Sequence, residues 1–343
     1  MHMGDALITP LVGGISLAAS AGMVGYSIRS LKTETFEQRL PLMGVMGAFL
    51  FAAQMINFTI PGTGSSGHIG GGLLLAAILG PGAGFITLAC VLLIQALFFA
   101  DGGILAYGCN LINMGFFTIF LAYPYIFKSI VKKGMTKKRI ITASILASVV
   151  GLQFGSLGVV LETLLSGRTE LNLFTFIMFM QPIHLAIGVV EGIITGLIVS
   201  YLYSQNKEMI DFISHESQEN DSKNIPEKAA SKKKIIIGIL GAAIFVGGLV
   251  SLFASSNPDG LEWAILNTTK AQEIVNHSPV IAWVEAAQGK LALLPDYSFK
   301  NSTGEGFIGT SASGIFGSII TLGLTVIIGL SIRRSRKQSI KHE

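Results

Sequence analysis

Two histidines and the amino terminus form a candidate site for a transition-metal ion. The chain begins Met1-His2-Met3, and a free terminal amine, the next backbone nitrogen and the His2 imidazole can close two fused chelate rings on one ion. A second imidazole, from His68, would complete a planar set of four nitrogens. Among divalent ions this geometry favours Ni(II) or Cu(II). We therefore expect Met1, His2 and His68 to be the metal ligands.

Several polar residues could support this site or line a pathway from it. An imidazole ligand usually needs a hydrogen-bond partner that fixes its tautomer. The candidates for a supporting or pathway role are Asn57, Ser66, Asp101, His184 and Glu191. Asp101 lies at a turn, where a carboxylate also makes a good cap. His184 and Glu191 share one helix face, so they could equally be a hydrogen-bonded pair that holds helices together.

The glycine-rich run at residues 62–69 resembles a phosphate-binding loop only superficially. In the motif G-x-x-x-x-G-K-[ST] a lysine reaches the phosphates and a hydroxyl holds Mg²⁺. Here His68 and Ile69 stand at those two positions. We therefore expect the ATPase of any ATP-driven transport to be a different polypeptide.

The elements that position these residues are expected to be membrane helices. Apolar residues make up 50% of the chain, charged residues make up 13%, and the mean hydropathy is +0.63. Soluble domains average about 25% charged residues, and crossing a hydrocarbon core takes roughly 20 apolar residues. The expected spans are 6–29, 40–59, 69–80, 82–100, 104–127, 140–165, 172–204, 235–255 and 314–332. The predicted fold is an all-α, polytopic membrane helix bundle.

The third of these segments, 69–80, is too short for a full crossing and is rich in glycine. We expect it to be tilted, broken or partly re-entrant. Irregular backbone at membrane depth is tolerated where protein encloses it.

The distribution of basic residues predicts the orientation in the membrane. With the amino terminus outside, the Lys and Arg residues gather in the inner loops, the 205–234 segment and the C-terminal tail. Only Arg168, Lys270, Lys290 and Lys300 then lie outside. Because cytoplasmic loops carry an excess of Lys and Arg, we expect the amino terminus outside and the carboxyl terminus in the cytoplasm. Met1, His2 and His68 then share the outer face.

The chain divides into two membrane units. Residues 1–204 form a predicted seven-span unit, and 205–234 is a polar, charged segment typical of a flexible cytoplasmic linker. Residues 235–343 form a second unit of two spans around an outer loop, 256–313. A loop this long is usually functional. We expect it to interact at the outer face and to control access to the metal site or its loading.

Small residues recur every four positions on the first span, at Gly14, Ala18 and Gly22, followed by Tyr26. Such faces let helices approach closely. The favoured interpretation is packing inside the protein, and the alternative is docking of another membrane subunit.

Several ordered runs resemble a known family. They are Met1-His2-Met3, 43–58, 64–68, 79–81, 95–103, 108–110, 113–115 and 182–184 with Glu191-Gly192. Together they are similar to the CbiM/NikM family, the substrate-binding membrane components of energy-coupling factor (ECF) transporters for cobalt and nickel. The run Pro258-Asp259-Gly260-Leu261-Glu262 is similar to the PDGLE signature of the small CbiN/NikN partner subunit.

The resemblance implies a non-catalytic subunit of the cell membrane of a prokaryote. Its partners would be a membrane coupling subunit, cytoplasmic ATP-binding cassette subunits and membrane lipid, with no nucleic acid. The family's ligand set corresponds to Met1, His2 and His68. No cofactor is expected to be permanently bound, because Co(II) or Ni(II) is the cargo. The metal would serve cobalamin biosynthesis or a nickel enzyme, and the sequence does not separate these two.

Two other classes of protein compete with this interpretation. A secondary transporter driven by an ion gradient usually carries ionisable relays at mid-membrane and often inverted repeats, and few buried carboxylates and no convincing repeat are found here. A membrane enzyme with a catalytic metal needs an open coordination position. Four planar nitrogens would instead form a closed carrying site.

Overall fold

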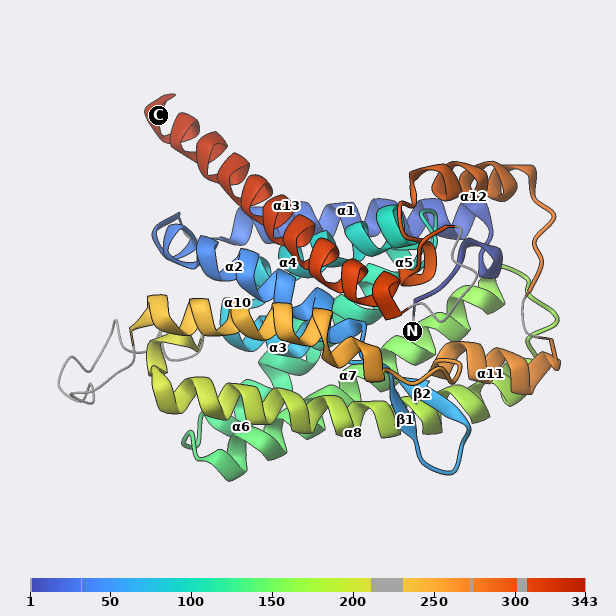
Figure 1. Ribbon diagram of the computed structural model, residues 1–343, viewed down its shortest axis with the longest axis horizontal. Coiled ribbons are helices and arrows are strands. Elements are labelled where there is room, and N and C mark those ends of the chain that lie inside the picture. The colour runs from blue at the N-terminus through green and yellow to red at the C-terminus, as the bar shows by residue number, and fades with distance from the viewer. Residues whose placement is uncertain (1, 32, 211–230, 272–273, 301–306, 343) are drawn as a thin grey trace.

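Long apolar helices run side by side along the longest axis of the molecule (Figure 1). The computed structural model describes residues 2–31, 33–210, 231–271, 274–300 and 307–342. Within these residues, 7 helices are long and apolar enough to cross a membrane. The single sheet found there is one short hairpin of 2 strands. The predicted all-α membrane bundle is confirmed.

In the described residues, the first unit has eight α-helices and the hairpin. The helices are α1 (Pro10–Ser30), α2 (Thr33–Gln54), α3 (Gly72–Leu79), α4 (Pro81–Ile94), α5 (Tyr107–Leu111), α6 (Lys128–Val131), α7 (Lys137–Leu165) and α8 (Leu173–Gln205). π-Helical turns at Gln95–Phe99 and Ile112–Phe127 continue α4 and join α5 to α6. Strand β1 (Phe58–Ile60) pairs antiparallel with β2 (Ser65–Gly67).

Side-chain caps explain where three of the long helices begin. The Thr9 hydroxyl accepts a hydrogen bond from the Val12 amide ahead of α1, and Pro10 occupies the first turn. Thr136 and Asn172 cap α7 and α8 in the same way. A capping side chain satisfies one of the amides that a helix start leaves without a partner.

The third predicted span is a broken crossing, as its sequence suggested. Helix α3 has only 8 residues, all of them buried. Gly71 (φ 75°) precedes it and Gly80 (φ 80°) ends it. Glycine adopts such positive φ angles at little cost because it has no Cβ atom. The Arg39 guanidinium donates to the Leu79 carbonyl at 2.6 Å. The irregular backbone therefore runs through protein and not through lipid.

The second unit packs against the first along α2. Its helices are α10 (Lys232–Gly248), α11 (Gly260–Thr269), α12 (Pro279–Leu291) and α13 (Phe307–His342). A Cβ atom at Gly44 of α2 would lie 2.7 Å from the Val326 side chain of α13, so glycine is what permits this close approach. At the far end of the same contact, Arg333 pairs with Glu37 at 2.8 Å. Of the predicted linker 205–234, residues 211–230 lie outside those described.

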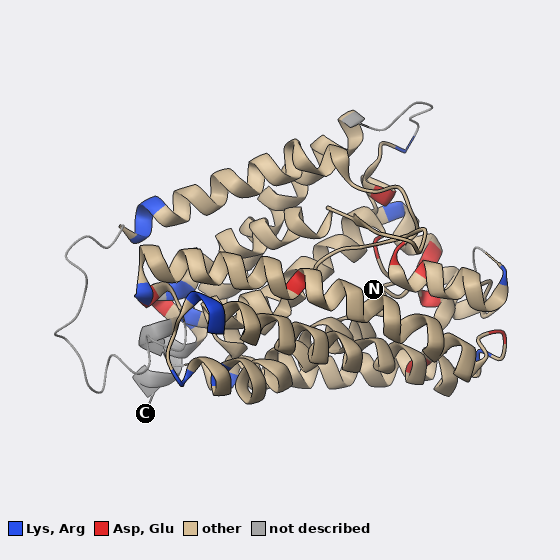
Figure 2. Cartoon of the chain, turned by 90° about the horizontal axis from the view of Figure 1, so that it is seen from below, with Lys and Arg blue, Asp and Glu red and all other residues tan. Residues whose placement is uncertain are grey.

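Charged residues separate toward the two ends of the bundle (Figure 2). Lys and Arg gather at the end where α1 finishes and where α7 and α10 begin. Most acidic residues in the described part of the chain lie at the opposite end, close to the amino terminus. In a membrane protein, such a difference in charge between the two ends of the bundle distinguishes its two faces.

The small-residue face of α1 does not pack inside the protein, so the favoured interpretation is wrong. Gly14, Ala18, Gly22 and Tyr26 are all exposed, and nothing described lies within 4 Å of a Cβ built at Gly14 or Gly22. The helix instead buries Gly13, Ser16 and Ser20. Small residues occur on both faces of α1, and the sequence alone does not tell which face turns inward.

Candidate metal site

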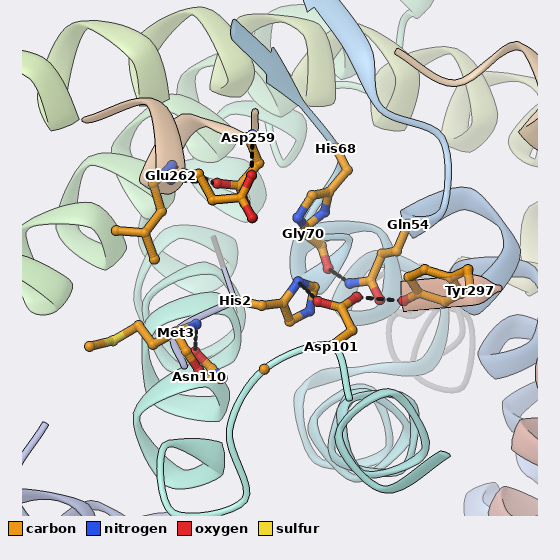
Figure 3. Close-up of polar contacts among 12 residues, drawn as sticks. His2, Met3, Gln54, His68, Gly70, Asp101, Asn110, Asp259, Glu262 and Tyr297 are labelled. Carbon is orange, nitrogen blue, oxygen red and sulfur yellow. Dashed lines mark hydrogen bonds and ion pairs between the residues drawn. The ribbon is translucent and has the colours of Figure 1, made fainter. Parts of the chain in front are cut away.

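His2 and His68 lie against each other at the acidic end of the bundle (Figure 3). Their rings are stacked, with centroids 4.9 Å apart and planes inclined by 14°. Two imidazoles bound to one ion through nitrogens at about 2.0–2.1 Å have ring centres roughly 4–6 Å apart. The distance between the ring centres therefore fits one ion, and the nearly parallel rings would have to turn so that the ion lies in the plane of each. Met1, the third predicted ligand, lies outside the described residues.

The segment after the amino terminus is fixed by Asn110, at the end of α5. The Met3 amide donates to Asn110 Oδ1 at 2.7 Å, and Asn110 Nδ2 donates to the Met3 carbonyl at 3.1 Å. The Gly103 amide donates to the same carbonyl at 2.9 Å. Two residues further on, Asp5 accepts a hydrogen bond from the Ala106 amide at 2.8 Å. These bonds hold the backbone that carries His2.

His68 leaves the hairpin at the end of β2 and begins the broken crossing. Its Nδ1 lies 3.2 Å from the Ile69 carbonyl oxygen, an acceptor that favours the tautomer with a proton on Nδ1 and a lone pair on Nε2. Glu191 of α8 accepts hydrogen bonds from the amides of Gly70 at 2.7 Å and Gly71 at 3.1 Å. Gln54 donates to the Gly70 carbonyl at 2.9 Å. Buried side chains thus satisfy the backbone groups that extended chain leaves unpaired.

The electrostatics of the site suit a cation. Burial lowers the pKa of both His2 and His68 to about 3, so both rings are neutral at neutral pH and can offer a lone pair. Asp101 Oδ1 lies 3.2 Å from His2 Nδ1, and the Tyr297 hydroxyl donates to the other oxygen of the same carboxylate. Burial raises the pKa of Asp101, and the hydrogen bond from Tyr297 opposes that rise.

The five supporting candidates have different surroundings. The Asp101 side chain faces the His2 ring. Its backbone amide donates to the Gln95 carbonyl and so closes the helical turn that precedes it. Ser66 and Asn57 bind the C-terminal unit. Ser66 Oγ donates to the backbone carbonyl of Asn257 at 2.7 Å. The backbone carbonyl of Asn57 accepts from the Ser255 amide at 2.7 Å. Neither hydrogen bond involves an imidazole.

His184 and Glu191 do not bind each other in the hydrogen bonds of the described residues. Glu191 binds the backbone after His68, as described above. His184 Nδ1 lies 2.8 Å from the Met180 carbonyl, and its Nε2 is buried without a hydrogen-bond partner among the described residues. His184 also lines a small cavity together with His68 and Asp259.

The PDGLE run folds onto the hairpin that carries His68. The Pro258 carbonyl accepts from the Ser66 amide at 2.8 Å. Asp259 and Glu262 form a reciprocal capping box at the start of α11, which satisfies amides at both residues. A Cβ at Gly260 would lie 3.3 Å from the His184 ring and 3.1 Å from Ile187. Four of the five residues of the run therefore have a role in seating α11 beside the site.

A further hydrogen bond and a buried side chain complete this seat. Trp263 Nε1 donates to the Thr63 carbonyl at 2.9 Å, at the tip of the hairpin. Leu261 is buried. The C-terminal unit thus contacts the hairpin from its tip to Ser66, two residues before His68.

Sequence reasoning missed Asn110 and Tyr297 as neighbours of the site. Asn110 lies in one of the runs that resemble the family, but no pattern showed that it binds Met3. Tyr297 is 196 residues from Asp101 in the chain. A contact between such distant positions depends on tertiary packing and leaves no local signal.

Comparison with known proteins identifies the family. Residues 2–209 match CbiM, described as the cobalt uptake substrate-specific transmembrane region, and residues 233–334 match the PDGLE domain. The chain belongs to the CbiM family. The resemblance seen in the sequence, to CbiM/NikM and to a fused PDGLE region, is therefore confirmed.

Two relatives of this CbiM-family chain carry nickel or cobalt in their names. A putative fused nickel transport protein NikMN of Archaeoglobus fulgidus is 30% identical over 328 residues, which cover 94% of this chain and 96% of that protein. A cobalt transport protein CbiM of Sorangium cellulosum is 27% identical over 217 residues, covering 62% of this chain and 95% of that protein. This CbiM-family chain is a multi-pass membrane protein of the cobalt and nickel transport family.

A solved structure agrees with the fold of this CbiM-family chain. The crystal structure of a transition metal transporter is similar with a TM-score of 0.52 at 30% identity, covering 63% of this chain and 98% of that one. A truncated transition metal transporter gives a TM-score of 0.51 at 31% identity, covering 60% of this chain and 99% of that one.

Proposed function

We propose that this chain is the substrate-binding component of an ATP-driven ECF-type importer of Ni(II) or Co(II). The observation that carries the proposal is the buried pair His2–His68, with stacked rings 4.9 Å apart and a carboxylate beside them. A chelate that includes the residue's own backbone nitrogen uses His2 Nδ1, because this atom closes a six-membered ring. His2 Nδ1, the Met1 amine, the His2 amide nitrogen and an imidazole nitrogen of His68 together make the set of four nitrogen ligands.

The donor set explains which ions would be carried. Deprotonating a backbone amide at neutral pH needs a strongly polarising ion, and nitrogen ligands suit the later transition metals. Mg²⁺ and Ca²⁺ prefer oxygen ligands and would be rejected. The fused relative from Archaeoglobus fulgidus is named for nickel, which makes Ni(II) the first ion to test.

The proposed orientation places the metal site outside and the basic end in the cytoplasm. The separation of charge along the bundle supports it (Figure 2), since the positive-inside rule applies to short loops near helix ends. Metal is then captured at the outer face and released inside after the partner subunits hydrolyse ATP. This chain binds and conducts the ion and catalyses no covalent reaction.

A face for a membrane partner is proposed on α1. Gly14, Ala18 and Gly22 lie exposed in a row on this helix. Lipid-facing small residues let a second helix approach closely. The coupling subunit would dock there.

The energy source distinguishes this function from its main rival. Uptake of radioactive Ni(II) by cells that express the chain with its partner subunits is expected to fall to background on ATP depletion. It is expected to persist with an uncoupler that leaves ATP in place. Uptake that an uncoupler abolishes while ATP stays high would identify a secondary transporter and contradict the proposal.

A further inference from the structure

A tyrosine of the C-terminal unit reaches the carboxylate that faces His2 (Figure 3). The Tyr297 hydroxyl donates to Asp101 Oδ2, and Asp101 Oδ1 lies 3.2 Å from His2 Nδ1. Three residues from three separate parts of the chain thus form one continuous series of polar contacts. A carboxylate with one oxygen engaged by a donor cannot turn freely, so its other oxygen stays directed at the ring.

The backbone that presents Tyr297 is strained. Asp296 has φ 49° and Tyr297 has φ 59°, and two consecutive non-glycine residues in the left-handed region are uncommon. Such conformations persist only where the surroundings over-determine them, and they cluster at functional sites. Here the Tyr297 ring stacks on Phe99, with centroids 5.0 Å apart and planes inclined by 22°. It also lies edge-on to Phe51 at 6.3 Å.

The same C-terminal loop binds the turn that carries Asp101 from both sides. The amides of Leu293 and Leu294 donate to the Phe98 carbonyl at 2.9 and 3.1 Å. Gln288 Nε2 donates to the Ala96 carbonyl at 2.9 Å and to the Gly102 carbonyl at 2.7 Å. The position of Asp101 therefore depends on whether this loop is seated.

We propose that Tyr297 is a positioning residue for the metal site, which it serves by orienting Asp101 toward His2. The inference rests on the proposed function. With the carboxylate held there, its charge offsets that of a dication bound to His2 Nδ1. By linkage, an ion that binds more tightly when Tyr297 is seated also stabilises the seated loop by the same factor. The C-terminal unit thereby sets the affinity of a site whose proposed ligands all lie in the other unit.

The test compares Ni(II) dissociation from full-length proteins that keep the native amino terminus and carry a tag only at the carboxyl terminus. Loaded protein is mixed with excess chelator, and loss of the Ni(II) absorption band is followed. The variants are Tyr297→Phe, Asp101→Asn and the double variant. The matched control is Tyr107→Phe, which loses a tyrosine hydrogen bond to the Ala89 carbonyl at 2.8 Å, a bond that involves neither histidine and no residue of the Asp101 turn.

Tyr297→Phe is expected to release Ni(II) about tenfold faster, the lower end of the effect of groups that orient ligands. Asp101→Asn should do so at least as strongly. The double variant should match Asp101→Asn, because a residue that acts through another adds nothing once that other is changed. Tyr107→Phe should keep the wild-type rate.

Two outcomes would overturn the inference: a Tyr297→Phe rate within twofold of wild type, or fully additive effects in the double variant. If Tyr297→Phe fails to fold, Gln288→Ala frees the same turn without touching the ring. Faster release from it supports the inference and a wild-type rate contradicts it. His68→Ala separates the two proposals, because equal Ni(II) binding by wild type and His68→Ala would overturn the proposed site itself.

Discussion

Replacing His68 with alanine is expected to weaken Ni(II) and Co(II) binding by more than about 100-fold, since groups that merely orient ligands already account for 10–100-fold. The substitution removes one of four proposed nitrogens and leaves an incomplete chelate at the amino terminus. Affinity would be measured by competition with a chelator of known strength, on purified full-length protein.

The control for this variant is His277→Ala. His277 is an exposed histidine of the C-terminal loop, so its loss removes an imidazole of the same kind without touching the site. Its affinity for Ni(II) should equal that of wild type. Wild-type affinity in His68→Ala would show that the ion binds elsewhere.

Replacing Glu191 with alanine is expected to lower both stability and metal affinity. The buried carboxylate accepts from the Gly70 and Gly71 amides at 2.7 and 3.1 Å. Without it two buried donors lose their partner, at a cost of about 1–3 kcal/mol each. The backbone that follows His68 would then loosen, and Ni(II) affinity should fall by about tenfold. Unfolding in detergent and hydrogen exchange at the two amides would measure the change.

Two further variants sharpen this test. Glu191→Gln keeps one acceptor oxygen and should lie between alanine and wild type. Thr195→Ala, one turn further along α8, removes a buried hydroxyl that has no hydrogen-bond partner among the described residues, and should change little. If Glu191→Ala left exchange at Gly70 and Gly71 unchanged, the proposed structural role of the carboxylate would be wrong.

The role of Glu191 in the structure differs from the roles that the sequence suggested, and the reason is physical. An ionisable residue inside a membrane span suggests a pathway or a pair with a neighbour such as His184. The sequence also showed that the third span was too short, but not that its amides would meet α8. Extended backbone at membrane depth needs acceptors, and Glu191 supplies two of them. Only the tertiary arrangement connects these two facts.

Other parts of the molecule were predictable because their causes are local. Seven of the nine predicted spans correspond to helices that are long and apolar enough to cross a membrane, because hydropathy is read over a window of helix length. The Met1-His2 chelate stays a prediction, made from chemistry within two residues. The inward face of α1 was not predictable, because glycine and alanine lie on both of its faces. Nor was Tyr297, whose contact with Asp101 joins residues 196 positions apart.

The most direct test of the account is metal binding by protein with its native amino terminus, compared with a variant that carries one alanine inserted between Met1 and His2. The insertion moves the terminal amine away from the His2 chelate ring but leaves Asn110 and its hydrogen bonds to Met3 in place. We expect stoichiometric Ni(II) or Co(II) binding by the wild type and none by the variant, with unchanged thermal stability of the two unloaded proteins. Equal binding by both would contradict the amino-terminal metal site.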